Sequence, residues 1–107
     1  MKITGTRVVE RRVIKLFNDS RDQANKEEKD KAQEIIRKIL DVFSIISVFE
    51  NFNHKEIVKK LYFSKNNIEV VGIRKMADLL YMDEKTLYKL RNKYCITVIA
   101  IMKSIKF

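Results

Sequence analysis

The clearest hydrophobic pattern in the chain lies between Gly72 and Tyr94, where apolar residues recur every three or four positions in two short blocks. This spacing predicts two amphipathic helices, because it places each block on one helix face. The expected inward residues are Ile73, Met76, Ala77 and Leu80 in the first helix, and Leu87, Leu90 and Tyr94 in the second. Tyr81 and Met82 would form the turn between them, and Asp83 would cap the second helix. The pattern therefore predicts a helix-turn-helix.

Two positions in this motif carry specific expectations. Ala77 is small enough to let two helices that cross at a steep angle approach closely. Tyr81 occupies a turn position that often needs a left-handed backbone, which glycine adopts easily and an aromatic residue adopts with strain. We therefore expect a turn of slightly unusual shape.

Similar apolar spacing predicts further helices on both sides of the motif. Asn53 followed by Glu56 resembles a capping box, which supports a helix start at the next residue. The apolar run Ile96–Met102 fits either a buried helix or a strand, and we expect a helix because a lone strand would have no sheet to join. The other expected segments run from Val8 to about Ser20, from Glu27 to Phe49 and from His54 to Tyr62.

These segments predict a single all-α domain of four to five helices, with the helix-turn-helix near the C-terminus. A chain of 107 residues, 46% of them hydrophobic, is long enough to bury one core and too short for two. It has no proline and only two glycines, which favours long helices with short connections. We expect one domain over residues 1–107, in which residues 1–53 form N-terminal helices of unassigned role and residues 54–107 form the helix-turn-helix region.

The second half of the segment from Glu27 to Phe49 is apolar on nearly every side, unlike its first half. A helix of this kind needs cover from more than one direction. The rest of the domain or a second copy of the chain could supply that cover, and the C-terminal apolar run makes a similar demand. We expect a homodimer joined through Val42–Phe49 or Ile96–Met102. The alternative is that these two segments pack on each other in a monomer.

The charge of the chain is strongly positive and unevenly distributed. Its 23 basic residues against 14 acidic residues give a formal net charge of +9, with a sequence pI near 9.7. Residues 72–107, which contain the motif, carry eight basic and three acidic side chains and form the most basic part of the chain. This balance favours a polyanionic partner, although composition alone also fits a ribosomal or membrane-surface role.

The outward side of the second motif helix has the chemistry of a DNA-reading surface. Long polar and cationic side chains can reach base edges and phosphates when such a helix lies in the major groove. The expected DNA-binding residues are Arg74, Lys75, Glu84, Lys85, Thr86, Tyr88, Lys89, Asn92 and Lys93, with Arg91 as a further phosphate contact. The alternative is an amphipathic hairpin whose charged face is only solvated.

The segment His54–Tyr94 contains four short pieces in a fixed order, which are Met76-Ala77, Leu80, Met82-Asp83 and Thr86-Leu87. With these pieces the segment resembles the DNA-binding fourth region of bacterial sigma factors, and more closely the sigma-like phage and prophage regulators of the RinA and ArpU families. The resemblance covers less than half of the chain, and residues 1–53 resemble no family that we can name. It implies a small activator of late phage genes that binds double-stranded DNA, with RNA polymerase as a candidate partner.

The sequence contains no convincing catalytic, cofactor or metal-binding constellation. His54 and Cys95 are the only residues of their types, too few for a zinc site of the usual ligands, and no glycine-rich phosphate loop is present. We expect His54 to be exposed in the first turn of its helix and Cys95 to be a small buried hydrophobic residue, with a nucleophile–base pair between them as the alternative. The single cysteine excludes an intramolecular disulfide and fits a reducing compartment. Because no signal peptide or transmembrane run is recognisable, we expect a cytoplasmic protein without a membrane partner.

Two functional hypotheses follow from these patterns. The first is a DNA-binding transcription regulator, encoded by a phage or prophage, that reads duplex DNA through the helix over residues 83–94. The second is a helical assembly or adaptor protein, such as a phage DNA-packaging component or a protein-interaction module. Neither hypothesis assigns an enzymatic activity, and salt-dependent binding of duplex DNA would separate the two.

Overall fold

Five helices follow one another along the chain, and the described residues contain no strand, as the apolar spacing predicts. The computed structural model describes residues 5–22 and 25–105, so residues 1–4, 23–24 and 106–107 of the predicted domain lie outside the described part. The helices are α1 (Thr6–Asp22), α2 (Lys26–Glu50), α3 (His54–Tyr62), α4 (Ile68–Leu79) and α5 (Glu84–Ser104).

Four helices begin at a short polar side chain that accepts hydrogen bonds from the backbone. Asn25 accepts from two N–H groups of α2 at 3.0 and 3.3 Å. Asn53 and Asp83 cap α3 and α5 as predicted, and Asn67 caps α4. Each cap satisfies donors that the first helical turn leaves without a partner. These side chains determine where the helices of the fold start.

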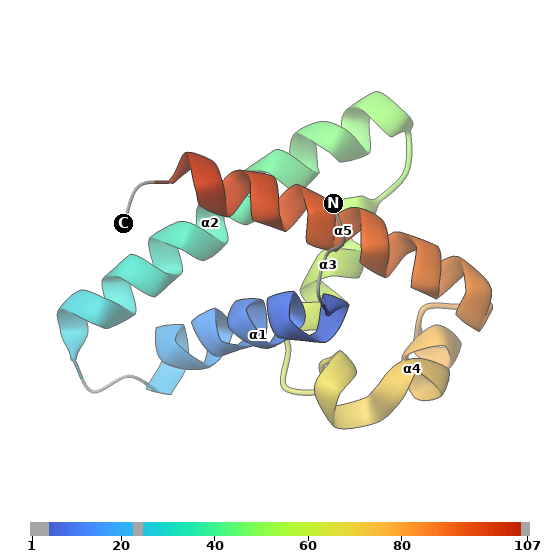
Figure 1. The fold of residues 1–107 in the computed structure, drawn as a ribbon, viewed down its shortest axis with the longest axis horizontal. Helices are drawn as coiled ribbons and strands as arrows, with labels where there is room; N and C mark the ends of the chain where they lie inside the picture. The colour runs from blue at the N-terminus through green and yellow to red at the C-terminus, as the bar shows by residue number, and fades with distance from the viewer. Residues whose placement is uncertain (1–4, 23–24, 106–107) are drawn as a thin grey trace.

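α1 and α2 follow each other as a helical hairpin, and in Figure 1 α5 crosses α2 and lies above α1 in the view. In the same view α3 lies near the centre, and α4 lies beside the first half of α5. Phe43 of α2 and Tyr94 of α5 pack edge to face, with ring centroids 5.2 Å apart. Val58, Leu61 and Leu87 are fully buried together with these rings. The core therefore lies where α2, α3 and α5 meet.

α5 continues for 21 residues without a break, from the second motif helix into the apolar C-terminal run. The predicted helix over residues 83–94 and the ambiguous run Ile96–Met102 therefore form one element. Val98 and Ile101 of this run are buried in the core. The N-terminal half of α5, which carries the exposed polar residues of the motif, is therefore continuous with a segment anchored in the core.

α4 is interrupted at Gly72, where the backbone takes a positive φ of 82°. One helical turn, residues 68–71, precedes the break, and the first helix of the predicted motif follows it. A Cβ at this position would meet no atom within 4 Å, so glycine is favoured here by its backbone conformation and not by lack of space. Gly72 therefore marks the start of the first motif helix.

The end of α2 is covered on one side only. Phe43 is fully buried, whereas Ile45, Val48 and Phe49 are 58%, 82% and 86% exposed. The chain itself therefore leaves part of the apolar segment Val42–Phe49 open to solvent. Within the described part of the chain, no helix combines the length and the apolar character that crossing a membrane requires.

Candidate nucleic-acid interface

The predicted helix-turn-helix consists of α4, a tight turn and the first part of α5. Ala77 and Leu87, one from each helix, are buried at 2% and 0% exposure. Tyr81 takes the left-handed backbone expected from its position, with a φ of 56°. The N–H of Met82 donates to the carbonyl of Ala77 at 3.0 Å, which closes the turn. The turn thus forms with tyrosine in the strained position, and the tyrosine side chain is 96% exposed.

Asp83 fixes the start of α5 directly after this turn. Its carboxylate accepts a hydrogen bond of 2.6 Å from the N–H of Thr86. This bond lowers the pKa of the Asp83 carboxyl from its ordinary value, because it stabilises the charged form. The negative charge also complements the positive end of the helix dipole. The start of α5, and with it the orientation of its exposed face, is therefore well defined.

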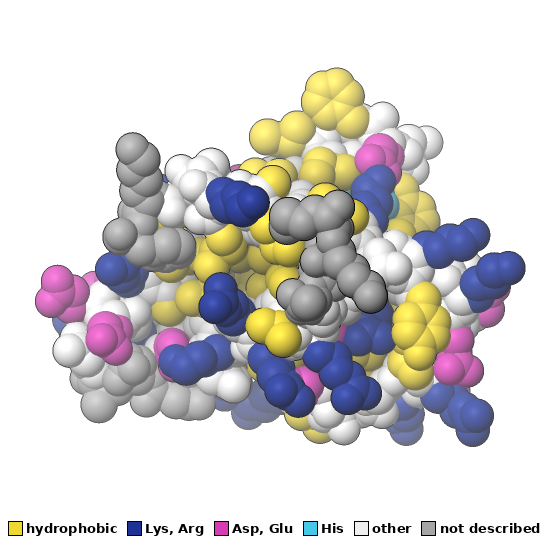
Figure 2. Space-filling view, in the orientation of Figure 1, with side chains coloured by type: hydrophobic (Ala, Val, Ile, Leu, Met, Phe, Trp, Pro, Cys, Tyr) yellow, Lys and Arg dark blue, Asp and Glu magenta, His cyan; other side chains and the backbone are white. Residues whose placement is uncertain are grey.

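Most of the predicted DNA-binding residues are exposed around the motif. Lys85, Lys89 and Asn92 follow one another at intervals of four and three residues, which places them on one side of α5. We call these three residues the reading face. Lys and Arg side chains gather around α4 and the first half of α5, at the right of Figure 2. The exposed members of the predicted set are Arg74 and Lys75 on α4, and Glu84, Lys85, Thr86, Tyr88, Lys89 and Asn92 on α5.

Lys93 lies at the edge of this region and is held toward the end of α2. Its Nζ contacts the two carboxylate oxygens of Glu50 at 2.5 and 2.6 Å, and its side chain is 39% exposed. Hydrogen bonds from Lys93 and from His54 lower the pKa of the Glu50 carboxyl, and the bond from Lys93 has the larger effect. Lys93 is therefore engaged within the chain, unlike the lysines of the reading face.

His54 is buried, so the exposed position expected from the sequence was wrong. Only 3% of its side chain is exposed. Its Nδ1 lies 2.7 Å from the hydroxyl oxygen of Tyr94, and its Nε2 lies 2.8 Å from a carboxylate oxygen of Glu50. The prediction failed because neighbouring helices satisfy both polar atoms of the ring, which makes its burial acceptable.

Cys95 is buried, as predicted, and the described structure gives it no catalytic environment. Burial raises the pKa of its thiol to about 11, so the thiol stays protonated near neutral pH. A protonated thiol is a poor nucleophile. The contacts of the His54 ring are to Tyr94 and Glu50, so these contacts do not support the alternative of a nucleophile–base pair with Cys95.

Arg91 is occupied within the fold, so its expected role as a phosphate contact was wrong. Its Nε and Nη2 donate to the two carboxylate oxygens of Glu10 at 2.9 and 2.7 Å. The side chains of Arg91 and Glu10 are only 12% and 3% exposed. The hydroxyl of Tyr62 donates to the same carboxylate at 3.0 Å. The expectation failed because it considered only the charge of Arg91, whereas this side of α5 meets a carboxylate on α1.

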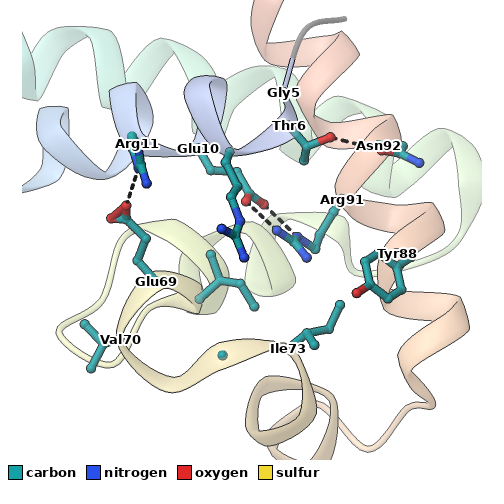
Figure 3. Close-up of a pocket in the computed structure, with 13 residues that line it drawn as sticks. Gly5, Thr6, Glu10, Arg11, Glu69, Val70, Ile73, Tyr88, Arg91 and Asn92 are labelled. Carbon is teal, nitrogen blue, oxygen red and sulfur yellow. Dashed lines mark hydrogen bonds and ion pairs between the residues drawn. The ribbon is translucent and has the colours of Figure 1, made fainter.

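A groove of about 820 Å³ lies beside the reading face, between α5, α1 and the start of α4 (Figure 3). We call it the α1–α5 groove. Tyr88 and Asn92 line it from α5, and the Glu10–Arg91 pair lies within it. The hydroxyl of Thr6 donates to the Oδ1 of Asn92 at 3.3 Å. α1, to which the sequence assigned no role, thus touches a residue of the reading face.

Arg7 and Arg11 of α1 also line this groove and were not among the predicted site residues. The charge of the N-terminal segment is a weak indication of an anionic partner. Residues 1–26 carry seven basic and three acidic side chains, but this count does not identify which of them form a site. Nothing in the sequence shows that α1 packs beside α5. Glu10 is more informative, because it shares a helix face with the apolar Val13. A carboxylate on a buried face needs a cation as a partner, so Glu10 indicates that a cationic side chain of another element packs against α1.

Comparison of the chain with models of protein families, with curated proteins and with solved structures finds no match.

Proposed function

We propose that the chain is a DNA-binding transcription regulator that places α5 in the major groove of duplex DNA. The observation that carries this proposal is the reading face, which presents Lys85, Lys89 and Asn92 on the exposed side of a helix whose opposite side is buried. Lysine can contact guanine acceptors or phosphates, and asparagine can pair with adenine through both atoms of its amide. An α-helix fits the major groove, which is about 12 Å wide.

The way α5 is held supports this role. Base-edge contacts require a helix in a fixed position, because discrimination depends on paired hydrogen bonds of correct geometry. Asp83 caps the start of α5, and Arg91 ties its middle to Glu10 on α1. Tyr94 packs against Phe43 one turn further along. The reading face therefore projects from a helix fixed on several sides.

The charge around the motif supports contacts with phosphates. Arg74 and Lys75 are exposed, and their side chains form no ion pair or hydrogen bond with any residue that the structure describes. They can therefore neutralise phosphates without breaking an existing pair. The resemblance to RinA and ArpU regulators extends the proposal to transcription in a phage or prophage, with RNA polymerase as a partner.

A titration of random-sequence duplex DNA with the chain at two salt concentrations tests DNA binding. Each neutralised phosphate releases counterions, so the logarithm of the binding constant falls with the logarithm of salt, with a slope of about −0.9 per contact. We expect binding at low salt that weakens steeply as salt rises. Absence of binding at low salt, or binding insensitive to salt, would reject this function and favour the adaptor hypothesis.

An assembly or adaptor role is favoured by a different observation, the apolar surface at the end of α2. We call Ile45, Val48, Phe49 and Phe52 the α2-end face; all four are exposed. Apolar side chains are visible at this end of the molecule, at the top of Figure 2. A groove of about 380 Å³ adjoins the face, lined by Phe52 and by residues of the motif turn that include Tyr81.

We propose that the α2-end face joins two copies of the chain. Its four side chains, Ile45, Val48, Phe49 and Phe52, are 58%, 82%, 86% and 46% exposed. Neighbouring apolar side chains that are exposed together mark a surface that another molecule can cover. A second copy of the chain would bring the same apolar face in return, as a two-fold interface requires. A dimer would also present two reading faces to a two-part DNA site.

A further inference from the structure

α1 brings a second set of cations to the neighbourhood of the reading face. Arg7 and Arg11 are both exposed, and both line the α1–α5 groove, whose wall on α5 includes Tyr88 and Asn92. The two arginines are four positions apart, which places them on the same side of α1. The hydrogen bond from Thr6 to Asn92 shows that this part of α1 directly adjoins the reading face.

The carboxylates that line the groove are paired. Glu10 is held by Arg91, and both side chains are nearly buried. Glu69 pairs with Arg11 at 3.1 Å, and these side chains remain 45% and 66% exposed. An ion pair this exposed is weak, so Arg11 can exchange the carboxylate for a phosphate. Within residues 5–22 and 25–105, the side chain of Arg7 forms no ion pair or hydrogen bond, so Arg7 can bind an anion directly.

We infer that Arg7 and Arg11 form a phosphate-binding edge that holds one strand of a DNA duplex beside the reading face. The inference rests on the proposed DNA binding by α5, and it gives α1 a function that the helix-turn-helix alone does not supply. When a helix lies in the major groove, the two sugar-phosphate strands run along its two sides. The α1–α5 groove follows one side of α5, so a strand on that side would meet both arginines.

Contacts of this kind would position the protein without reading sequence. Phosphates are the same at every base pair, so Arg7 and Arg11 would add affinity and salt dependence but no preference for particular bases. Sequence preference would remain with Lys85 and Asn92 on the reading face. The two surfaces therefore predict different effects when they are changed separately.

Glu69 provides a test in the opposite direction. Its carboxylate repels a phosphate strand and competes with that strand for Arg11. Replacing Glu69 with Gln should therefore tighten DNA binding. A damaged fold would weaken binding, so a complex tighter than that of a control variant that loses a carboxylate elsewhere reflects the changed electrostatics of the groove.

The experiment compares Arg7→Gln, Arg11→Gln and Glu69→Gln by titration of random-sequence duplex DNA over a range of salt concentrations. Arg12→Gln is the matched control for the arginine variants, because Arg12 is an exposed arginine of α1 that does not line the groove. Glu34→Gln is the control for Glu69→Gln, because it breaks a similarly exposed carboxylate–arginine pair on α2.

Each arginine variant of the groove should reduce the magnitude of the salt slope by about 1 and weaken binding by roughly two- to fivefold. Glu69→Gln should tighten binding by a similar factor. The two control variants should change binding and slope less than their counterparts in the groove.

Two other outcomes would overturn the inference, and they can be told apart. If the wild-type chain binds duplex DNA but the groove variants match their controls, α1 has no phosphate edge, and DNA binding by α5 stands. If the wild-type chain does not bind duplex DNA at low salt, the proposed function fails, and the phosphate edge fails with it.

Discussion

Glu10 on α1 and Arg91 on α5 are joined by hydrogen bonds of 2.7 and 2.9 Å, although 81 residues separate them in the chain. Tyr62 of α3 donates a third hydrogen bond to the same carboxylate, so three helices meet at one ion pair. Because the pair is almost fully buried, each charge depends on the other for compensation. This pair fixes one flank of α5, next to the exposed Tyr88 and Asn92 that line the same groove.

Replacing Arg91 with Met should lower the free energy of unfolding by about 3–5 kcal/mol, because Glu10 would stay buried without a counter-charge. Urea unfolding followed by circular dichroism measures the change. Arg12→Met, at an exposed position of α1, is the control and should stay within about 0.5 kcal/mol of wild type. The double variant Glu10→Leu/Arg91→Met should recover much of the loss, since it removes both charges. Equal stability of Arg91→Met and the wild type would contradict the buried pair.

Replacing Tyr81 with Gly should raise the free energy of unfolding by about 0.5–1 kcal/mol. Tyr81 has a φ of 56°, a conformation that costs a tyrosine on the order of 1–2 kcal/mol and a glycine almost nothing. Its side chain is 96% exposed, so little packing is lost. The gain is smaller than the strain because glycine is more flexible in the unfolded chain. Thermal unfolding at low protein concentration measures the difference.

Tyr88→Gly is the contrasting variant for this test. Tyr88 is also an exposed tyrosine, but it lies inside α5, where glycine should lower the free energy of unfolding by about 1 kcal/mol. Opposite signs for the two variants would identify backbone strain at the turn. A loss of stability in both would show that Tyr81 is not strained.

The helices of this fold could be predicted because their signals are local. Apolar residues at helical spacing marked the inward faces, and Asn53 and Asp83 marked two helix starts. The expected helix over Ile96–Met102 is confirmed. Its continuity with the second motif helix was not predicted, because the apolar run alone fits a buried helix or a strand. Val98 and Ile101 of this run pack in the core as part of one long helix, and that packing depends on distant parts of the chain.

The site residues could also be predicted only as far as local spacing along a helix determines them. Exposed residues of α5 could be identified because they lie opposite its apolar stripe. The contacts of His54, Arg91 and Lys93 could not be predicted, because their partners lie 40, 81 and 43 positions away in the chain. Each of the three polar side chains is held by another helix, which helical spacing alone does not reveal.

Lys85→Ala and Asn92→Ala should relax sequence preference by about 1–3 kcal/mol for each base contact that is lost. Both residues are exposed, so the free energy of unfolding should change little. Selection of bound duplexes from a randomised pool, followed by titration of selected and random DNA, measures the preference. Lys75→Ala on α4 is the control, because loss of a phosphate contact should weaken both complexes equally. If the two variants keep the wild-type preference, the reading face is misassigned.

Phe49→Glu should separate the proposed dimer into single chains. Phe49 is 86% exposed in one chain, so the substitution should leave the monomer fold intact. In a dimer formed through the α2-end face, the new carboxylate would be buried without a partner, at a cost of several kcal/mol. Light scattering over a concentration series should show the wild type approaching twice 12.7 kDa and the variant remaining near 12.7 kDa.

Ile96→Glu distinguishes the two interfaces that the sequence allows for a dimer. Ile96 is 57% exposed on α5 and belongs to the other apolar segment, so this variant should remain dimeric if the α2-end face is the interface. Val70→Glu, at a 65% exposed position of α4, controls for an added charge elsewhere and should also remain dimeric. Dissociation by Ile96→Glu alone would move the interface to α5. A wild-type mass that stays near 12.7 kDa into the high micromolar range would rule out the dimer. It would leave the DNA-binding proposal intact, because all three residues of the reading face belong to a single chain.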